Sequence, residues 1–302
     1  MAAAGVDVRT ALTGVTAVLV TPYRQDRLDE GTLEDLAART EQAGVHVLTS
    51  LGNTAEVFQL TPAERTAHLS AVARASASAV LLAGVSGAAA SVLAEIETAA
   101  SLGYSAAMVH EPADPFGDSE GFVRYYAEIS RHSALPLVLY VRSDRLDVDG
   151  LRRVVAAEAV VGVKFARADL GTLSVLLEGG AAAGCTWVNG AAESRAPQFL
   201  ALGLTGFTSG VADVRPDLAL AVHAALRAGD REALERQVGL LAPVEALRST
   251  GRGKYNVAVL KELLRMHGVE AGPVRPPHCE VTASGREVLQ RAVAAWPPPA
   301  PA

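Results

Sequence analysis

The sequence predicts an α/β fold, a (β/α)8 TIM barrel with a C-terminal helical appendage. Short apolar segments recur along the chain, and segments with helical spacing lie between them. The 302 residues are enough for one barrel of ~250 residues plus an appendage. Eight repeats favour a closed sheet. An open, doubly wound sheet is the alternative, and the lack of a G-x-G-x-x-G motif after any strand argues against it.

Eight apolar segments are the candidate strands. Strands that pack against each other on one side and under helices on the other should be apolar nearly throughout, and these segments are. They are residues 15–21, 45–50, 79–84, 106–110, 136–141, 160–165, 185–190 and 206–210.

Helical spacing identifies the segments between the strands. Apolar residues recur every three or four positions in 31–44, 61–75, 91–103, 120–132 and 194–204. One helix has a clear start, because Thr61 precedes Pro62 and Glu64 follows three residues after the cap. Gly44 and Gly103 are typical of helix ends.

We expect three parts along the chain. Residues 1–230 would form the barrel with an N-terminal leader, and residues 231–295 a three-helix appendage that packs on the barrel or makes oligomer contacts. The appendage helices are expected at 230–248, 255–268 and 283–296. Residues 296–302 are rich in proline and are expected to be a disordered tail.

The composition is typical of a globular protein that acts on small molecules. Hydrophobic residues make up 50% of the chain, and the formal net charge of −6 argues against nucleic acid as a partner. No apolar run approaches the ~18 residues that would cross a membrane. Residues 1–14 lack the basic and apolar parts of a secretory signal. We therefore expect a cytoplasmic protein without membrane contact.

The sequence gives no sign of a metal or cofactor. Cys185 and Cys279 lie far apart and outside any C-x-x-C motif, so we interpret both as reduced thiols without a special role. No cluster of His, Cys, Asp and Glu has metal-ligand spacing, and no phosphate-binding P-loop is present. We expect neither a metal nor a cofactor.

One lysine stands out in the sixth apolar segment, AVVGVKFAR (159–167). The chain has three lysines, Lys164, Lys254 and Lys261, and arginine fills every other Lys or Arg position. Arginine does not lose its proton in proteins, whereas a desolvated lysine can, and a neutral amine is a nucleophile. Lys164 is therefore a candidate for covalent catalysis. The alternative is a lysine whose stem packs along the strand while its ammonium group reaches solvent.

Polar residues gather where the predicted strands end. The active site of such a barrel lies at the carboxyl ends of the strands. Lys164 ends the sixth segment and Tyr140 lies at the end of the fifth, so the two side chains can meet over one cavity. The other polar positions are Thr21, the loop 51–56, His110, Asn189 and the loop 207–210.

Four stretches resemble the class I lyases of the dihydrodipicolinate synthase and N-acetylneuraminate lyase family. They are GVTAVLVTPY (14–23), LGNTAE (51–56), PLVLY (136–140) and GVKFARADL (162–170). The resemblance implies an eight-stranded barrel with C-terminal helices, usually a tetramer, in which a lysine forms an imine with a 2-oxo acid. It also implies that Lys164 is the Schiff-base lysine, that Tyr140 relays protons, and that Gly52, Asn53 and Thr54 hold the substrate carboxylate.

The chemistry explains these residue types. A lysine with an ordinary pKa of about 10.4 is inert, and burial can bring the pKa towards ~7 to 8. Tyr140 can carry protons while the imine forms, with the Thr54 hydroxyl as its partner. The alternatives are an ordinary core tyrosine at 140 and a turn residue at 54.

Departures from the family bear on the substrate. Dihydrodipicolinate synthases carry a tyrosine pair after the fourth strand, and Ala113 and Asp114 stand there in this chain. Arg145 falls where the synthases hold the carboxylate of their aldehyde, and Arg142 where the sugar-acid dehydratases tend to have arginine. The stretch AGPVRPP (271–277) is similar to one in the 5-dehydro-4-deoxyglucarate dehydratases. Both arginines could equally be solvated loop residues.

Three further positions are candidate substrate-binding residues. His110 ends the fourth segment at the expected cavity mouth, and Asn189 ends the seventh. Ser209 lies in the loop GFTSGVAD, which has the small and hydroxyl residues of an anion nest. A structural histidine and a tight turn are the alternatives at 110 and 209.

The sequence therefore predicts a lyase, aldolase or dehydratase that forms a lysine Schiff base with a small-molecule 2-oxo acid, either pyruvate or a 2-oxo-3-deoxy sugar acid. One alternative is a dihydrodipicolinate synthase that condenses pyruvate with aspartate semialdehyde. Another is a catalytically silent protein that binds a small acid. A homo-oligomer, dimer or tetramer, is expected from the resemblance.

Overall fold

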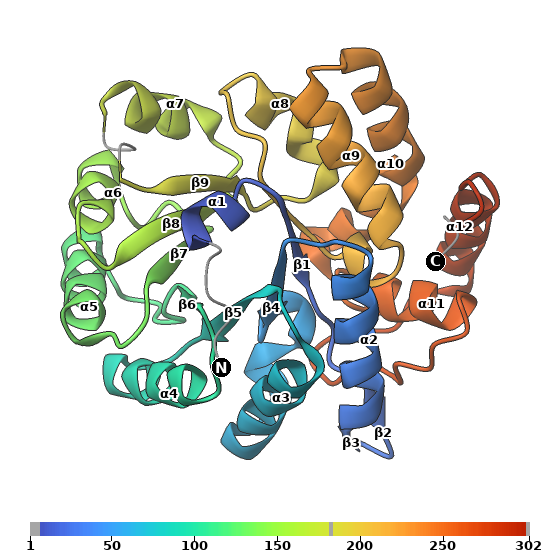
Figure 1. The fold of residues 1–302 in the computed structure, drawn as a ribbon, viewed down its shortest axis with the longest axis horizontal. Helices are drawn as coiled ribbons and strands as arrows, with labels where there is room; N and C mark the ends of the chain where they lie inside the picture. The colour runs from blue at the N-terminus through green and yellow to red at the C-terminus, as the bar shows by residue number, and fades with distance from the viewer. Residues whose placement is uncertain (1–6, 181–183, 300–302) are drawn as a thin grey trace.

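The computed structural model describes residues 7–180 and 184–299. Eight parallel strands close into a barrel in the order β1-β10-β9-β8-β7-β6-β5-β4, which confirms the predicted fold (Figure 1). The strands are β1 (Val15–Val18), β4 (Val47–Ser50), β5 (Val80–Val85), β6 (Ala106–Val109), β7 (Leu137–Val141), β8 (Val160–Phe165), β9 (Thr186–Asn189) and β10 (Phe207–Ser209). A small hairpin of β2 (Tyr23–Arg24) and β3 (Arg27–Leu28) follows β1.

Helices surround the barrel and alternate with its strands (Figure 1). They are α1 (Val8–Ala11), α2 (Glu30–Gln42), α3 (Pro62–Ala75), α4 (Ala89–Ser101), α5 (Ser119–His132), α6 (Val148–Val155), α7 (Leu170–Glu178), α8 (Ala196–Leu200) and α9 (Pro216–Ala228). Four short 3-10 helices follow strands or precede helices: η1 (Asn53–Ala55), η2 (Val57–Gln59), η3 (Glu193–Arg195) and η4 (Val211–Asp213).

The barrel interior is filled by side chains and closed at one end. Met108, Val138 and Val188 belong to a buried cluster that also includes Leu12, just after α1. A Cβ atom at position 206 would lie 2.0 Å from the carbonyl oxygen of Leu12, so only glycine allows this approach. α1 therefore covers the amino-terminal end of the barrel, where Figure 1 shows it across the centre. The carboxyl ends of the strands remain for the site.

Three helices follow the barrel and lie together on one side of it (Figure 1). They are α10 (Arg231–Gly253), α11 (Ala258–Met266) and α12 (Ala283–Ala294). The carboxylate of Asp230 caps α10 by accepting from the backbone N–H of Ala233 at 2.9 Å. Thr250, Gly251 and Arg252 have non-helical backbone angles, so the regular part of α10 ends close to residue 248, where the sequence pattern ends it.

Ordered structure continues past residue 296, where the sequence predicted that a disordered tail begins. Trp296 is 7% exposed, and its indole Nε1 donates to the carbonyl oxygen of Leu240 at 3.1 Å. The carbonyl oxygen of Pro297 accepts from Arg215 at 3.0 Å. A large aromatic ring gains more from packing on α10 than the chain loses in entropy, so ordered structure extends past the predicted boundary. Residues 300–302 of the expected tail, and residues 1–6 of the expected leader, lie outside the described residues.

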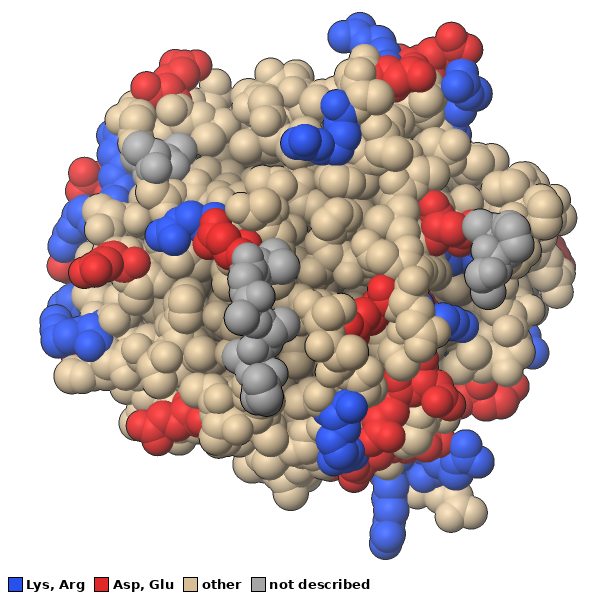
Figure 2. Space-filling view, viewed as in Figure 1, with Lys and Arg blue, Asp and Glu red and all other residues tan. Residues whose placement is uncertain are grey.

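Charges of both signs lie around the margin of one face of the molecule. Figure 2 shows Lys and Arg side chains interspersed with Asp and Glu along the outline, while the centre of this face is largely uncharged. Among the described residues, no helix combines the length and the apolar character that crossing a bilayer requires.

Candidate active site

Lys164 and Tyr140 lie side by side at the carboxyl end of the barrel. They are paired in register on the neighbouring strands β8 and β7. The Nζ atom of Lys164 lies 4.2 Å from the centroid of the Tyr140 ring. Both side chains are buried, with exposed fractions of 5% and 7%. The ammonium group of Lys164 thus does not reach solvent along the strand, and the sequence prediction that the two side chains meet holds in the structure.

The surroundings of Lys164 favour a neutral amine. Within the described residues, the side-chain Nζ of Lys164 makes no hydrogen bond or ion pair. Burial lowers its pKa to about 7, and the positive charges of Arg142 and Arg248 act in the same direction. A Cβ atom at position 190 would lie 2.9 Å from the Cγ of Lys164, so glycine there leaves room for the lysine stem. A large fraction of the amine is therefore free to act as a nucleophile at neutral pH.

Tyr140 is held by an amide. Its hydroxyl oxygen accepts from the Nδ2 of Asn53 at 3.1 Å. Burial raises the pKa of Tyr140, while Arg142 and the bond from Asn53 oppose part of that rise. The phenol therefore keeps its proton at neutral pH, and because Asn53 occupies the oxygen as a donor, the phenol proton is free for another acceptor.

The loop 51–56 places Asn53, not Thr54, against Tyr140. The Oγ1 of Thr54 donates to the carbonyl oxygen of Val18 at 2.8 Å. The expected Thr54–Tyr140 pair is therefore corrected, because the turn of η1 directs the Thr54 hydroxyl towards β1. Gly52 precedes η1, and a Cβ atom there would lie 2.3 Å from the Cγ1 of Val18, so the loop needs glycine at this position.

Long-range contacts anchor the end of this loop. The Oε1 of Glu56 lies 2.7 Å from the Nζ of Lys261 on α11, and both side chains are buried. Its Oε2 accepts from the backbone N–H of Arg275 at 2.7 Å. Thr21, expected at a strand end, lies beyond β1, and its hydroxyl donates to the carbonyl oxygen of Ala55 at 2.5 Å. The loop is thus fixed from β1 and from the C-terminal helices.

A cleft of about 380 Å³ opens beside Tyr140. It lies over the carboxyl ends of β6 and β7 and is bordered by the loops that follow β4, β6 and β7. Its size suits a small organic acid. The lining residues are Asn53, Phe58, His110, Glu111, Pro112, Ala113, Tyr140, Arg142, Ser143 and Arg145.

The two arginines of the cleft differ in their freedom. The guanidinium group of Arg145 donates to the carbonyl oxygen of Asp114 and, at 3.4 Å, to that of Pro112. It therefore ties down the loop after β6. The side chain of Arg142 is exposed and makes no hydrogen bond or ion pair to the described residues. Of the two, Arg142 is the one available to a ligand.

Glu111 is a structural residue of the cleft that the sequence reasoning missed. Its carboxylate accepts from the backbone N–H of Arg142 at 2.8 Å and from that of Ser143 at 3.0 Å. It thereby joins the loops after β6 and β7. Its position directly after a strand end was the available signal, since acidic residues there can accept from a neighbouring loop.

His110 also lines the cleft, but as a neutral group. Its Nε2 lies 2.9 Å from the carbonyl oxygen of Leu51. Burial lowers the pKa of His110 to about 4, and the charges of Lys164 and Arg65 add to this. The ring of His110 is therefore uncharged at neutral pH.

Asn189 and Ser209 are not part of the cleft. The Nδ2 of Asn189 donates to the carbonyl oxygen of Ala192, and its Oδ1 accepts from the N–H of Ala191, both at 2.8 Å. The Oγ of Ser209 donates to the carboxylate of Glu193 and accepts from a backbone N–H at 2.8 Å. Both side chains are buried and bonded within the protein. These groups hold the loops after β9 and β10, and a substrate contact at either residue stays a prediction.

The stretch 271–277 also lies away from the cleft. The guanidinium group of Arg275 pairs with Glu64 at 2.7 Å and with Asp26 at 3.1 Å, and lies 4.2 Å from the centroid of the Tyr23 ring. It connects the C-terminal region to the β2–β3 hairpin and the start of α3.

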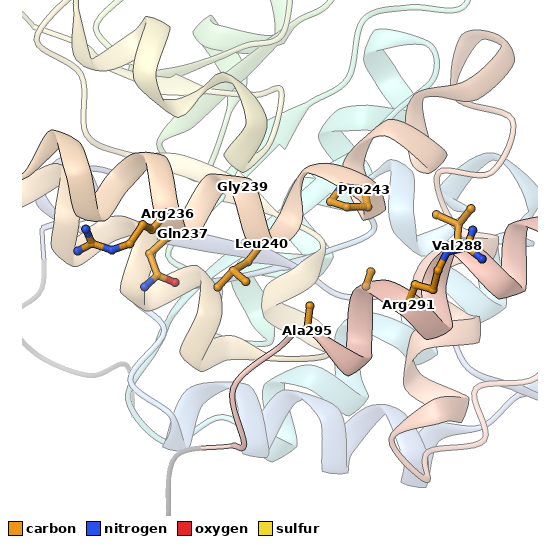
Figure 3. A pocket seen from close by; sticks show the side chains of 9 residues that line it. Arg236, Gln237, Gly239, Leu240, Pro243, Val288, Arg291 and Ala295 are labelled. Carbon is orange, nitrogen blue, oxygen red and sulfur yellow. The ribbon is translucent and has the colours of Figure 1, made fainter.

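A second hollow lies elsewhere in the structure. A groove of about 590 Å³ runs between α10 and α12, as Figure 3 shows, and contains Arg236, Leu240 and Arg291. None of its lining residues borders the cleft beside Tyr140. It offers no nucleophile or carboxylate. Tyr140 and Glu111 border the smaller cleft, and Lys164 lies beside Tyr140.

Within the described residues, no group of three or more His, Cys, Asp and Glu side chains is arranged to hold a metal ion.

The closed barrel and its buried strand-end lysine define an enzyme of the class I aldolase type, a lyase. Residues 11–296 match the family described as the Dihydrodipicolinate synthetase family, and the chain belongs to that family.

Relatives and solved structures agree with this assignment. A probable 5-dehydro-4-deoxyglucarate dehydratase of Streptomyces coelicolor is 30% identical over 268 residues, which cover 85% of this chain and 84% of the relative. An uncharacterised DapA-like lyase of Halobacterium salinarum is 30% identical over 273 residues, 88% of each chain. The crystal structure of a dihydrodipicolinate synthase from Oceanobacillus iheyensis has a TM-score of 0.92 at 25% identity and covers 95% of this chain and 97% of that one.

Proposed function

We propose that the enzyme forms a Schiff base between Lys164 and the ketone of a 2-oxo-3-deoxy sugar acid, and then acts as an aldolase or a dehydratase. The supporting observation is the amine itself: Lys164 is buried, unpaired among the described residues, and its pKa is lowered to about 7 beside Tyr140. In this proposal Tyr140 carries the proton, and the backbone N–H groups of Gly52 and Asn53 hold the carboxylate next to the ketone.

The proposed chemistry starts with attack of the Lys164 amine on the carbonyl carbon. The amine gives up one proton to the carbonyl oxygen and Tyr140 donates a second, so the oxygen leaves as water. A protonated imine and a phenolate at Tyr140 remain, and the phenolate can take up the proton lost in the next step. The imine draws electrons from the neighbouring carbon. Loss of a proton from that carbon gives an enamine that can expel a hydroxyl group as water; alternatively, the next carbon–carbon bond breaks while the adjacent hydroxyl becomes an aldehyde.

Arg142 supports a substrate with a second, distal carboxylate. Its exposed guanidinium group borders the cleft without a side-chain partner among the described residues, whereas that of Arg145 is occupied by loop carbonyls. Arginine binds carboxylates in a bidentate manner. The relatives described as 5-dehydro-4-deoxyglucarate dehydratases are consistent with this choice.

Condensation of pyruvate with aspartate semialdehyde is the second candidate. Its support is the likeness to dihydrodipicolinate synthase structures, such as the one from Bacillus clausii with a TM-score of 0.92 at 26% identity. Against it, the loop after β6 offers Ala113 and Asp114 and no tyrosine hydroxyl.

A homo-oligomer, dimer or tetramer, is likewise our proposal, supported by the family resemblance.

The test is reductive trapping followed by a substrate panel. Borohydride with pyruvate or 2-keto-3-deoxygluconate should leave an adduct on Lys164, seen by peptide mass, in the parent protein and in Lys254→Ala. It should be absent in Lys164→Ala. No adduct with any 2-oxo acid would refute the proposed chemistry. The panel then compares 2-keto-3-deoxygluconate, 5-dehydro-4-deoxyglucarate, N-acetylneuraminate, and pyruvate with aspartate semialdehyde. Fastest turnover of the last pair would establish the synthase instead.

A further inference from the structure

His110 is held in one orientation at the wall of the cleft. Its Nε2 lies 2.9 Å from the carbonyl oxygen of Leu51. Its ring lies edge-on to Phe58 and to Tyr140, with centroid distances of 5.7 and 5.6 Å. The ring lines the cleft. One hydrogen bond and two aromatic contacts therefore fix the imidazole beside Tyr140.

The contact with Leu51 determines which nitrogen carries the proton. A carbonyl oxygen can only accept, so Nε2 must donate and Nδ1 of the neutral ring is left as an acceptor. Leu51 has a φ of 56°, an unusual value for a residue other than glycine, and this backbone conformation belongs to the loop that precedes η1. The acceptor for Nε2 is thus part of the backbone, which a side-chain rotation cannot remove.

The second nitrogen of the ring is open to a ligand. No described residue bonds Nδ1 of His110. Both ring nitrogens of His68 are buried without a partner, whereas Nδ1 of His110 is not among the buried unpartnered atoms. Because the ring lines the cleft, a molecule in the cleft can reach this nitrogen.

Burial keeps the ring neutral. It lowers the pKa of His110 to about 4, and positive charge on Lys164, Arg65 and Arg142 acts in the same direction. The groups that contact the ring, Phe58, Tyr140 and the carbonyl of Leu51, bring no negative charge at neutral pH. At neutral pH the open nitrogen therefore accepts hydrogen bonds and does not donate them.

We propose that His110 determines substrate specificity by accepting, through Nδ1, a hydrogen bond from a hydroxyl group on the part of the substrate beyond the ketone. This inference rests on the proposed function and assigns the residue that recognises a hydroxyl group of its substrate. A lone pair repels a carboxylate and attracts a hydroxyl, so Arg142 and His110 divide the cleft wall between the two kinds of group. The structure thereby assigns the site to a hydroxylated acid in preference to an unsubstituted chain.

The experiment measures imine trapping with two 2-oxo acids of equal length. 2-Keto-3-deoxygluconate carries hydroxyl groups and 2-oxohexanoate carries none, and each forms an adduct on Lys164 whether or not turnover follows. The parent protein should reach half-maximal trapping at an about 10- to 100-fold lower concentration of the hydroxylated acid. In His110→Phe this preference should fall by about tenfold or more, and His110→Asn, whose amide oxygen can accept, should keep part of it.

The control is His132→Asn, an exposed histidine on α5, which should keep the preference of the parent protein. A parent protein without preference, or a His110→Phe variant with the full preference, would overturn the inference. Failure of every acid to form an adduct would instead refute the Schiff-base proposal, so the two outcomes are distinguishable.

Nuclear magnetic resonance of isotope-labelled histidine gives a second readout on the unmodified protein. His110 should show a proton on Nε2 and none on Nδ1. The Nδ1 resonance should shift when 2-keto-3-deoxygluconate is added, and it should shift much less with pyruvate. A proton on Nδ1, or a charged ring at neutral pH, would contradict the proposal.

Discussion

Lys164 owes its reactivity to its surroundings. Burial withdraws the water that would stabilise an ammonium group, and two arginines, Arg142 and Arg248, lower the pKa further, to about 7. Tyr140 brings no negative charge at neutral pH because burial raises its pKa. The two groups therefore meet as a neutral amine and a neutral phenol, the forms from which addition and proton transfer can start.

Imine formation should follow the fraction of free amine. With a pKa of about 7, that fraction falls roughly tenfold for each pH unit below 7 and is nearly constant above about 8. The rate of adduct formation with pyruvate, measured by trapping and mass spectrometry, should rise with pH and then level near neutrality. A rate that keeps rising to about pH 10 would indicate an ordinary lysine.

The same pKa shift opposes folding. The folded pKa of Lys164 lies below the unfolded value of 10.5, so the unfolded chain binds more protons between about pH 7 and 10.5. The resulting cost is present in full below about pH 7 and is relieved as pH rises through that window. Lys164→Met should therefore raise the free energy of unfolding in urea by about 1 to 4 kcal/mol at about pH 6. An equal gain at about pH 10 would contradict this explanation.

Tyr140→Phe tests the proton carrier. The ring keeps its packing, so the variant should fold normally while turnover falls by about 10² to 10⁴, the range for loss of one acid–base group. Thr54→Val should lower turnover much less, because the Thr54 hydroxyl bonds the carbonyl of Val18 and not Tyr140. Steady-state kinetics on both variants test this. A loss of turnover in Thr54→Val as large as that in Tyr140→Phe would support the Thr54–Tyr140 proton relay predicted from sequence.

The sequence identified Lys164 and Tyr140 because the end of a strand can be read from an apolar run. It did not show that Asn53 contacts Tyr140, since the rotation of a 3-10 turn decides which of two adjacent side chains faces the cleft. Asn189 and Ser209 lie at strand ends, as expected, yet their own loops occupy their polar atoms. Position in a barrel is readable from sequence, whereas the hydrogen-bond partner is not.

At the scale of elements, apolar periodicity located every barrel strand and the three C-terminal helices. Apolar periodicity did not identify the helices α6, α7 and α9. The segment of α7, LGTLSVLLE, has only nine residues, and α6 has only eight, so each offers too few turns for a clear helical period. Their starts are nevertheless ordinary: Asp147 caps α6 by accepting from Gly150, and Asp169 caps α7. Capping residues were the stronger signal for these short helices.

The loops after β6 and β7 suggest a matched pair of arginine variants. Arg142→Met should raise the KM for a substrate with a distal carboxylate by about 10- to 100-fold and leave kcat nearly unchanged, because a charged hydrogen bond is lost in ground state and transition state alike. Its melting temperature should stay near that of the parent protein.

Arg145→Met should behave in the opposite way. It leaves the carbonyls of Pro112 and Asp114 without their donor and should lower the melting temperature by a few degrees. Equal KM effects in the two variants would show that Arg145 also binds substrate.

At the scale of the whole molecule, the C-terminal helices support the site. Glu56 ends the loop that carries Asn53, and its buried carboxylate pairs with Lys261, 205 positions later in the chain. No local sequence pattern connects residues so far apart. The sequence therefore predicted the appendage but not its contact with the loop at the active site.

Lys261→Met should expose this dependence. It leaves the buried carboxylate of Glu56 without its cation, at an expected cost of about 3 to 5 kcal/mol in the free energy of unfolding. Lys254→Met, at an exposed lysine, should cost little. Urea denaturation measures the stability of both variants. The pyruvate concentration that gives half-maximal trapping should rise only in Lys261→Met. Equal stability of the two variants would show that the pair does not hold the loop.

The chain has only three lysines, which has a practical consequence for chemical labelling. Lys261 is occupied by Glu56, Lys254 is exposed, and Lys164 has a pKa of about 7. An ordinary lysine is protonated at neutral pH, so among the lysine side chains a small amine-selective reagent should react first at Lys164. Protection of Lys164 from such a reagent, read by peptide mass, would report a ligand bound beside Tyr140, so inhibitors could be screened before any natural substrate is identified.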